Sequence, residues 1–594
     1  MNTFLGELKR RKVFQVAVAY GVVAWLVMQV VDVVGEPLRL PDWLDSVVIV
    51  LLLAGFPVAV VIAWAFDLTS AGVVRTPSRE TATADAKGPE QIAGSEPAST
   101  GKDVSPGRPP RRVLRNSIAV LPFENLSPNP DDAFFAAGIH EEILNYLARI
   151  KDLSVIARTS VKRYAGSDKP IAEIAAELGV GTVMEGSVRY AGDRVRVTTQ
   201  LIDATTEENL WSEVYERQLA DVFAIQADIA EHIARALKAE FSAAEKESIE
   251  TLPTTGSADA HALYLQSQAL FAQGDNAMAA TTPPGVRAAI QSRLDRVIEL
   301  DPNFANAYAL KALLHAISRI YDPIDQQDWL ERCVEIKKAV HKNAEQALEL
   351  SDNIGLPYFA LALHEQLTWR GTEADAHYQK ALSLRPNDSN ILGWYSVLKW
   401  SADDFEEAIR LGEKAHALDP ANAYVNAFLG NTLHAAGKHR ASIELHEKAA
   451  RENPSSSLPY LLQAIPEHAL GDDARAIQAL KIADELMPEE AVPGIRAHIA
   501  YGYKNVGRDE DANRVWNRVE QSMSNRFYDP ALWVWGYRIK GDRAAALEAL
   551  RKAIEQPQYR QEIFLHTFLK QNNWHDPVLD ESEFVKLRNR LAMK

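Results

Sequence analysis

Residues 381–454, ALSLRPNDSNILGWYSVLKWSADDFEEAIRLGEKAHALDPANAYVNAFLGNTLHAAGKHRASIELHEKAARENP, repeat one pattern every 34 residues. An alanine opens each period and a proline follows it by five residues: Ala381, Ala415 and Ala449, with Pro386, Pro420 and Pro454. A small side chain lets two helices approach closely, and proline ends a helix because it has no amide hydrogen to donate. A 34-residue period is typical of tetratricopeptide helix-turn-helix repeats, so the stretch predicts stacked helix pairs.

The same period extends over residues 347–488 and changes on both sides of them. Upstream, the marker Asp301-Pro302 precedes its counterpart Asp352 by 50 residues, which predicts one longer repeat. Downstream the spacing loosens, because Gly507 lies 36 residues after Gly471. We expect an all-α tetratricopeptide superhelix of about seven repeats with a C-terminal helical cap over residues 256–594.

The composition excludes several classes of protein. The chain has 594 residues, of which 47% are hydrophobic and 24% charged, as in ordinary folded proteins. Its net charge of -16 argues against general nucleic-acid binding, which needs a basic surface. The one cysteine, Cys333, permits no internal disulfide and no cysteine-based metal site.

The N-terminal part predicts a membrane hairpin over residues 1–75. Residues 13–34 and 46–66 are two apolar runs of about 21 residues each, long enough for the ~30 Å hydrocarbon core of a bilayer. Basic residues precede the first run and follow the second, whereas the short turn between them holds only Arg39. The positive-inside rule then places the N-terminus and the remainder of the chain in the cytoplasm. Residues 76–115 are rich in Pro, Gly, Ser, Thr and Ala, which predicts a flexible linker.

Residues 116–245 predict a small mixed α/β domain. Strands are expected over residues 117–123 and 153–157, a hairpin over 182–190 and 194–202, and a last strand over 210–215. Helical spacing appears over residues 132–150, 171–178 and 222–241. The expected order is β-α-β-α-β-β-β-α.

Three stretches of this domain resemble a known family: AVLPFENLS (119–127), FFAAGIHEEILNYLARIKDLSVIARTS (134–160) and the run from ELGVGTVMEGSVRY to FAIQADIA (177–230). They look like the TolB-like amino-terminal domain that precedes tetratricopeptide arrays in bacterial proteins. The apolar N-terminal segment is similar to the membrane hairpin of such proteins. The resemblance implies signalling or regulation and supplies no catalytic residue, because the family has none established.

Motifs for catalysis, cofactors and metals are missing. Neither G-x-x-x-x-G-K-[ST] nor G-x-S-x-G occurs. His140-Glu141-Glu142 lacks the second histidine that H-E-x-x-H needs to place two zinc ligands on one helical face, and His364-Glu365 and His446-Glu447 fail likewise. We expect no enzyme activity, no cofactor and no metal.

The repeats offer a candidate peptide-binding groove. By analogy with the family, certain positions of each first helix face a concave surface: Asn390, Val397, Trp400, Tyr424, Asn431, His434, Leu461 and His468. Asparagine can hydrogen-bond a peptide backbone, and aromatic residues can hold its side chains. The alternative is that these residues only pack between neighbouring helices.

Two hypotheses for function follow. The first is a membrane-anchored scaffold that binds protein or peptide partners through the groove and contacts the lipid bilayer through residues 13–66. The second is a ligand-sensing regulator that acts through the α/β domain on transcription or second-messenger signalling. A large pocket with convergent polar groups in that domain would favour the second.

Overall fold

The computed structural model describes residues 66–69, 72–75, 116–127, 133–191, 194–218, 222–237, 242, 251–273, 284–321, 329–488, 493–523, 530–555 and 575–589. It divides into two units, residues 1–107 and 108–594. In the first unit, β1 (Phe66–Thr69) pairs antiparallel with β2 (Gly72–Arg75). Phe66, which ends the second predicted span, therefore begins a strand.

The predicted membrane spans, residues 13–34 and 46–66, lie outside the described residues except for Phe66, and the predicted linker, residues 76–115, lies outside them entirely. Among the described residues, none of the helices has the length and apolar character needed to cross a bilayer. The membrane hairpin and its orientation stay predictions.

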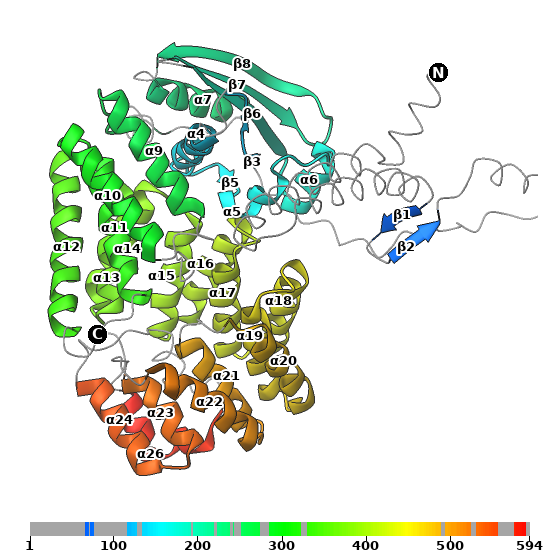
Figure 1. Ribbon diagram of the computed structural model, residues 1–594, viewed down its shortest axis with the longest axis vertical. Coiled ribbons are helices and arrows are strands. Elements are labelled where there is room, and N and C mark those ends of the chain that lie inside the picture. The colour runs from blue at the N-terminus through cyan, green and yellow to red at the C-terminus, as the bar shows by residue number, and fades with distance from the viewer. Residues whose placement is uncertain are drawn as a thin grey trace, which may run out of the picture. The chain divides into compact units, whose positions relative to one another are not determined.

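The second unit begins with a mixed α/β domain whose strands run in the order β5-β3-β6-β7-β8 (Figure 1). β3 (Ser117–Val120) lies parallel to both β5 (Ser154–Val155) and β6 (Thr182–Ala191). β6, β7 (Arg194–Asp203) and β8 (Asn209–Gln218) form an antiparallel meander, and the short β4 (Glu124–Asn125) extends the pairing along β6. The predicted mixed α/β domain is confirmed.

Helices cover both faces of this sheet. α4 (Ala133–Leu147) and α7 (Val222–Ala236) enclose a core with Ile118, Val120 and Met184. On the other face, α5 (Arg158–Val161), the 3-10 turn η2 (Lys162–Tyr164) and α6 (Ile171–Leu178) pack on Ala119 and Val183. Alternate residues of β3 therefore enter opposite cores, as the two-residue period of a strand requires.

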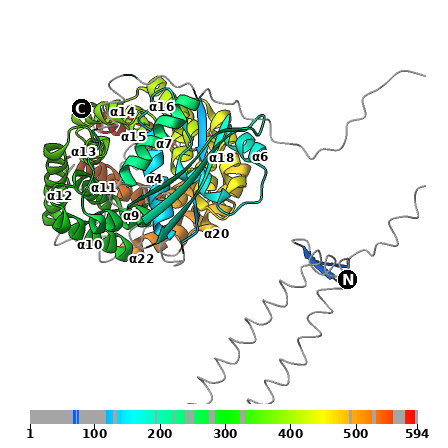
Figure 2. The same cartoon turned by 90° about the horizontal axis from the view of Figure 1, so that it is seen from above.

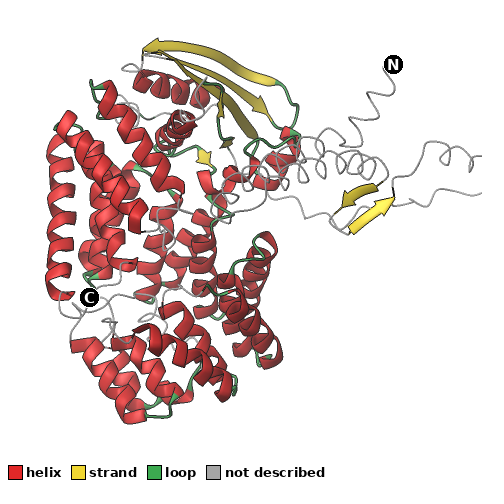
Figure 3. Ribbon diagram, viewed as in Figure 1, coloured by secondary structure: helices red, strands yellow, loops and turns green. Residues whose placement is uncertain are grey.

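The helical array follows, and Figure 3 shows its described part as helices throughout. The array starts with α9 (Ala258–Gln273), α10 (Pro284–Leu300), α11 (Ala305–Tyr321) and α12 (Trp329–Leu350). It continues with α13 (Gly355–Leu367), α14 (Gly371–Leu384), α15 (Ser389–Ser401), α16 (Phe405–Leu418), α17 (Ala423–Ala435), α18 (His439–Glu452), α19 (Ser457–Ala469) and α20 (Asp473–Leu486). It ends with α21 (Pro493–Asn505), α22 (Asp509–Met523), α23 (Pro530–Ile539), α24 (Arg543–Glu555), η5 (Pro577–Asp580) and α26 (Ser582–Arg588).

The predicted 34-residue period is confirmed in the helix boundaries. From α13 to α20, first helices start at residues 355, 389, 423 and 457, and second helices at 371, 405, 439 and 473. The longer repeat is also present, because α11 has 17 residues where α13 has 13, and α12 has 22 where α14 has 14. The looser spacing appears at α21, which starts 36 residues after α19.

The 34-residue period arises from close packing of helices at the repeated alanines, as the sequence suggests. Ala347, Ala381, Ala415 and Ala483 have no exposed surface, and Ala449 is 8% exposed. Each repeat proline lies two residues beyond the end of its second helix, as Pro420 does after α16. The turns within later repeats use glycine in the left-handed region, for example Gly471 with φ of 81°.

The small side chain of Ala415 makes a direct prediction. Ala415→Leu adds three carbons at a closed helix contact, which we expect to cost about 1–3 kcal/mol of stability through overpacking. Ala441, on the exposed face of α18, offers the matched control, and Ala441→Leu should change stability by less than about 0.5 kcal/mol. Denaturant midpoints of the purified chain measure both; equal midpoints for the two variants would contradict the packing assignment.

Candidate functional site

The α/β domain rests on three consecutive turns between repeats of the array. Asn353, Asn387 and Ala421 occupy equivalent turn positions, 34 residues apart. Arg149 Nη1 donates to the Asn353 carbonyl oxygen at 3.1 Å, and the Ala421 amide donates to Ser160 Oγ at 3.0 Å. The repeat period therefore sets the spacing of the points on which the domain docks.

The central turn makes the most hydrogen bonds. The Asn387 side chain is buried, and its amide nitrogen donates to the carbonyl oxygens of Ile150 at 2.8 Å and Leu153 at 2.7 Å. Its backbone amide donates to the Ala148 carbonyl oxygen at 3.3 Å. These carbonyls belong to the loop of residues 148–153 that follows α4, and the Ile150 carbonyl oxygen also accepts from the Leu153 amide at 3.1 Å. Asn387 therefore fixes this loop of the α/β domain on the array.

The third turn centres on a buried carboxylate. Ser160 Oγ donates to Asp419 Oδ1 at 2.7 Å, and Asn422 Nδ2 donates to Asp419 Oδ2 at 2.9 Å. The Ala157 amide donates to the Leu418 carbonyl oxygen at 2.8 Å. Burial raises the pKa of Asp419 to about 6, against the lowering effect of its hydrogen bonds. Ser160 thus binds two groups of the same turn, the Asp419 carboxylate and the Ala421 amide.

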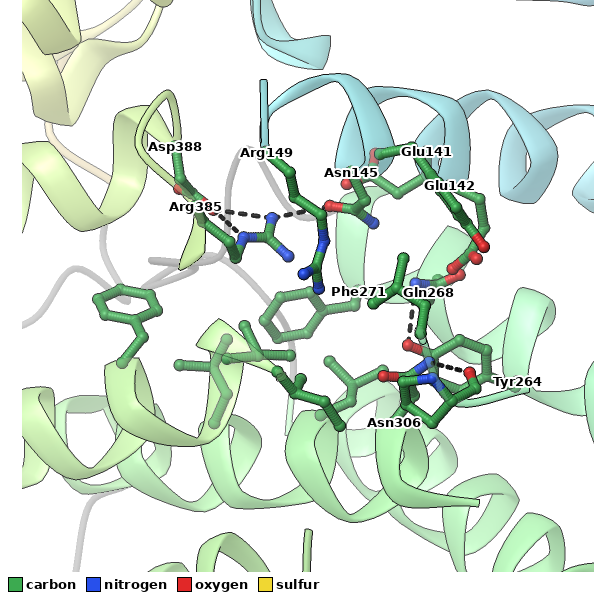
Figure 4. A pocket seen from close by; sticks show the side chains of 18 of the residues that line it. Glu141, Glu142, Asn145, Arg149, Tyr264, Gln268, Phe271, Asn306, Arg385 and Asp388 are labelled. Carbon is green, nitrogen blue, oxygen red and sulfur yellow. Dashed lines mark hydrogen bonds and ion pairs between the residues drawn. The ribbon is translucent and has the colours of Figure 1, made fainter. Parts of the chain in front are cut away.

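Beside these contacts the junction holds a cavity of about 130 Å³, drawn in Figure 4. Its walls come from α4 on the domain side and from α9, α11, α13 and α15 on the array side. A second cavity of about 130 Å³ adjoins it and shares Glu141, Asn145 and Arg385. Each volume approaches the roughly 150 Å³ of an engineered cavity that binds benzene, so each is of the size that a small organic molecule needs.

Close packing of α4 on α9 brings the two walls together. A Cβ on Gly138 of α4 would lie 2.8 Å from Leu265 Cβ of α9, closer than side chains tolerate. Leu265 belongs to the same buried cluster as the core of the α/β domain. Figure 2, viewed from above, also shows α4 and α9 as neighbours. Glycine at this position permits the contact that closes the junction.

Arg385 joins the domain to the array at the cavity. Its Nε donates to Asp388 Oδ2 at 3.0 Å, and its Nη2 donates to Asn145 Oδ1 of α4 at 2.8 Å (Figure 4). The ion pair with Asp388 measures 2.8 Å. Asp388 in turn caps α15 by accepting hydrogen bonds from the amides of Asn390 and Ile391. The Arg385 guanidinium is thereby held in one orientation.

Two adjacent carboxyl groups of α4 face the cavity. Glu142 is 5% exposed, and burial raises its pKa to about 7, although its hydrogen bond with Gln268 acts the other way. Burial likewise raises the pKa of Glu141, opposed by the positive charges of Arg158 and Arg385. Near neutral pH the pair therefore carries a proton part of the time.

The structure brings few of the predicted groove residues to a surface. Asn390, Val397 and Trp400 lie on α15, Tyr424, Asn431 and His434 on α17, and Leu461 and His468 on α19. Val397, Trp400 and Leu461 belong to the hydrophobic core of the array, with at most 1% exposure, because they pack between helices as the alternative interpretation holds. Asn431 and His434 are also buried, whereas Asn390, Tyr424 and His468 are half-buried. Asn390 lines both junction cavities.

Part of the predicted groove faces a C-terminal segment of the same chain. The His575 ring lies edge-on to that of His434, with 5.8 Å between centroids, and His434 Nδ1 lies 3.0 Å from His439 Nδ1. His575 is anchored by its neighbour Asp576, which accepts hydrogen bonds from Tyr501 and Arg538. Among the described residues, no group of His, Cys, Asp and Glu has the geometry to hold a metal ion.

Sequence reasoning missed the junction. Sequence patterns identify His140-Glu141-Glu142 only as an incomplete zinc motif, and they assign no role to Arg385 or Gln268. The signal was present in the turn Arg385-Pro386-Asn387-Asp388, which carries two charged groups and an asparagine where the next repeat has Asp419-Pro420-Ala421-Asn422.

The junction predicts a large effect of one asparagine. Asn387→Ala removes donors from buried carbonyls, so we expect a loss of about 1–3 kcal/mol and faster hydrogen exchange over residues 148–160. Ser455 occupies the equivalent turn position two repeats later and is exposed, so Ser455→Ala is the matched control. Exchange that stays at the wild-type rate in Asn387→Ala would refute the docking role of this side chain.

Glu142 predicts a pH dependence. Its pKa is higher in the folded chain than in the unfolded chain, so ionisation costs stability, and the folded unit loses this contribution as pH rises from about 4.5 to about 7. Burial lowers the pKa of His140 to about 4, so His140 makes the folded chain more stable as pH rises from about 4 to 6.5. The contribution of Glu142 must therefore be measured as the difference between wild type and a variant. We expect Glu142→Gln to gain stability relative to wild type on going from pH 5 to pH 8, by up to about 3 kcal/mol. Denaturant midpoints at both pH values measure it, with exposed Glu444→Gln as control; a pH-independent difference would contradict the raised pKa.

Solved structures that match parts of this chain come from several bacteria. PilF of Pseudomonas aeruginosa is 19% identical, with a TM-score of 0.28, and covers 37% of this chain and 92% of its own. TTC0263, a tetratricopeptide protein of Thermus thermophilus, is 21% identical, with a TM-score of 0.28, covering 32% and 98%. TolB of Acinetobacter baumannii is 17% identical, with a TM-score of 0.16, covering 22% and 29%. These scores are too low to support an argument about function.

Among curated proteins, a putative adenylate cyclase 3 of Rhizobium meliloti (strain 1021) is 35% identical over 278 residues. The match covers 46% of this chain and spans 41% of the relative's length. Anaphase-promoting complex subunit 3 of Schizosaccharomyces pombe is 22% identical over 173 residues, 29% of this chain and 24% of its own. Residues 114–232, which hold the α/β domain, match the family model described as HilA/YgeH-like transcriptional regulator, second domain.

Proposed function

We propose that the chain is a non-enzymatic regulatory protein of a signalling system, in which the α/β domain and the repeat array act as one unit. The observation that carries this proposal is the docking of the domain on three consecutive repeat turns. Arg149 and Ser160 of the domain hydrogen-bond to the first and third of these turns, and Asn387 of the central turn donates to the domain. A change at the junction would therefore alter the positions of α13, α15 and α17, the helices that follow these turns.

The match to a domain of transcriptional regulators and the adenylate cyclase relative support regulation over simple scaffolding. A passive scaffold needs no polar cavity between its parts, whereas a regulator that senses a ligand does. The sensing site of this proposal is the junction cavity between α4 and the array, instead of a pocket inside the α/β domain.

The array is the partner-binding part of this proposal. Repeat arrays present extended surfaces that bind proteins and peptides. His575 lies against His434, so a peptide that binds this part of the groove has to share or replace the contact with the C-terminal segment. Half-buried Tyr424, on the first helix α17, remains accessible in part.

Membrane attachment completes the proposal. The apolar runs of residues 13–34 and 46–66 would anchor the chain in a bacterial inner membrane, and the basic residues flanking them favour a cytoplasmic position for the folded unit. A similarity of the α/β domain to TolB-like domains fits this setting. Anchoring raises the effective concentration of the array for partners at the same membrane.

Partner capture tests the proposal. Photo-cross-linking in cells with the full chain should recover the same partner proteins with wild type and Ser455→Ala, and several-fold less with Asn387→Ala, because loosening the junction alters the positions of α13, α15 and α17. A transcript profile from the same strains should change with Asn387→Ala alone. A different result would identify a plain scaffold. In that case Asn387→Ala would leave the captured partners and the transcript profile unchanged, whereas Tyr424→Ala would abolish partner capture.

A further inference from the structure

The junction cavity contains hydrogen-bond acceptors that the protein leaves unmatched. Gln268 is 8% exposed and lines the cavity from α9; its Nε2 donates to the Tyr264 hydroxyl at 3.1 Å, but its Oε1 has no hydrogen-bond partner. Glu141 Oε2 is also buried without a hydrogen bond, and the nearest cation is Arg158 at an ion-pair distance of 3.8 Å. Buried acceptors of this kind cost about 1–3 kcal/mol each when nothing donates to them.

The cationic groups at the cavity are already engaged. Arg385 donates to Asp388 and to Asn145, and Arg149 donates to the Asn353 carbonyl oxygen. The atoms that lack a hydrogen bond are therefore acceptors, and a ligand with N–H groups would donate to them. An anionic ligand would bring further acceptors toward Glu141 and Glu142.

Much of the remaining wall is apolar. Phe271 of α9, which Figure 4 labels, lines the cavity together with Leu313 of α11 and Phe359 of α13. Small-molecule sites combine such walls with a few convergent polar groups that fix orientation. The cavity is smaller than the ~300–1,000 Å³ of drug-sized sites, so the ligand is small.

We infer that the junction cavity binds a small organic cation, a primary ammonium group on an apolar body. The ammonium donates to Glu141 Oε2 and Gln268 Oε1, and the apolar body packs on Phe271, Leu313 and Phe359. A simple amine and an amino acid both carry this chemistry, and the experiment below distinguishes them.

Protonation provides a second signature. The charged and titratable groups that face Glu142 are Glu141, Arg149, Arg385, Tyr146 and Tyr264. Since burial raises the pKa of Glu142 to about 7, an ammonium ion beside it favours the ionised carboxylate. Affinity should therefore increase from pH 6 to pH 8, and Glu142→Gln should remove this increase.

The site deepens the proposed function, on which its regulatory consequence rests. Its walls belong to α4 on one side and to α9, α11 and α13 on the other, so a bound ligand joins the domain to the array. A ligand that binds the docked state better than an open one shifts the population toward docking by its difference in affinity.

Calorimetric titration of the purified full-length chain tests the site with three probes that share a phenyl-alkyl body and differ in charge: 2-phenylethylamine, phenylalanine and 3-phenylpropionate. We expect saturable binding of the amine, the amino acid or both, and no binding of the propionate. The tighter binder of the first two shows whether the ligand is a simple amine or an amino acid. Glu141→Gln and Gln268→Met should each weaken binding at least tenfold, while Glu444→Gln, on the exposed face of α18, should leave it unchanged.

Thermal midpoints establish that the two site variants are folded, and wild-type hydrogen exchange over residues 148–160 should slow when the probe is bound. Equal binding of 3-phenylpropionate, no binding of any probe at millimolar concentration, or unchanged affinity in both folded variants would overturn the assignment. Calorimetry needs no protein partner. A failure of ligand binding can therefore be distinguished from a failure of the proposed function, which partner capture tests.

Discussion

The structure depends on the hydrogen bonds by which one asparagine of the array fixes the loop that follows α4. Asn387 donates to carbonyl oxygens that follow this helix, and it can do so because the repeat period places a turn there. The neighbouring turns at Asn353 and Ala421 add contacts on either side. Buried donors and acceptors that pair only in the docked arrangement make the undocked one costly, so the domain and the array are expected to behave as one body.

This arrangement also explains why ionisable groups collect at the junction. A flat apolar contact would hold the two parts together without selecting a geometry, whereas Arg385 with Asp388 and Asn145 permits one orientation. The same packing buries Glu142 and Asp419 and raises their pKa values. The stability of the junction therefore depends on the protonation of these two carboxyl groups.

Local patterns predicted most of the fold because their causes are local. The alanine and proline period predicted the helix pairs from α13 to α20, and alternation of apolar residues predicted the β6–β7 hairpin. The docking of α4 on the repeats could not be predicted in this way, since Asn387 and Ile150 are 237 positions apart. Sequence spacing identifies the first helices of the repeats but not which of their faces is buried. For this reason the sequence could not tell whether Val397 and Trp400 line a groove or pack between helices, and in the structure both lie in the core.

The central claim is that the α/β domain and the array form one docked unit, and a distance between them tests it most directly. Spin labels at Ala172→Cys on α6 and Ala441→Cys on α18, both exposed, report that distance in the full chain with buried Cys333 changed to Ser. The account predicts one narrow distance distribution. A broad or multimodal distribution in the otherwise unchanged chain would show that the domain is not docked, and would contradict it.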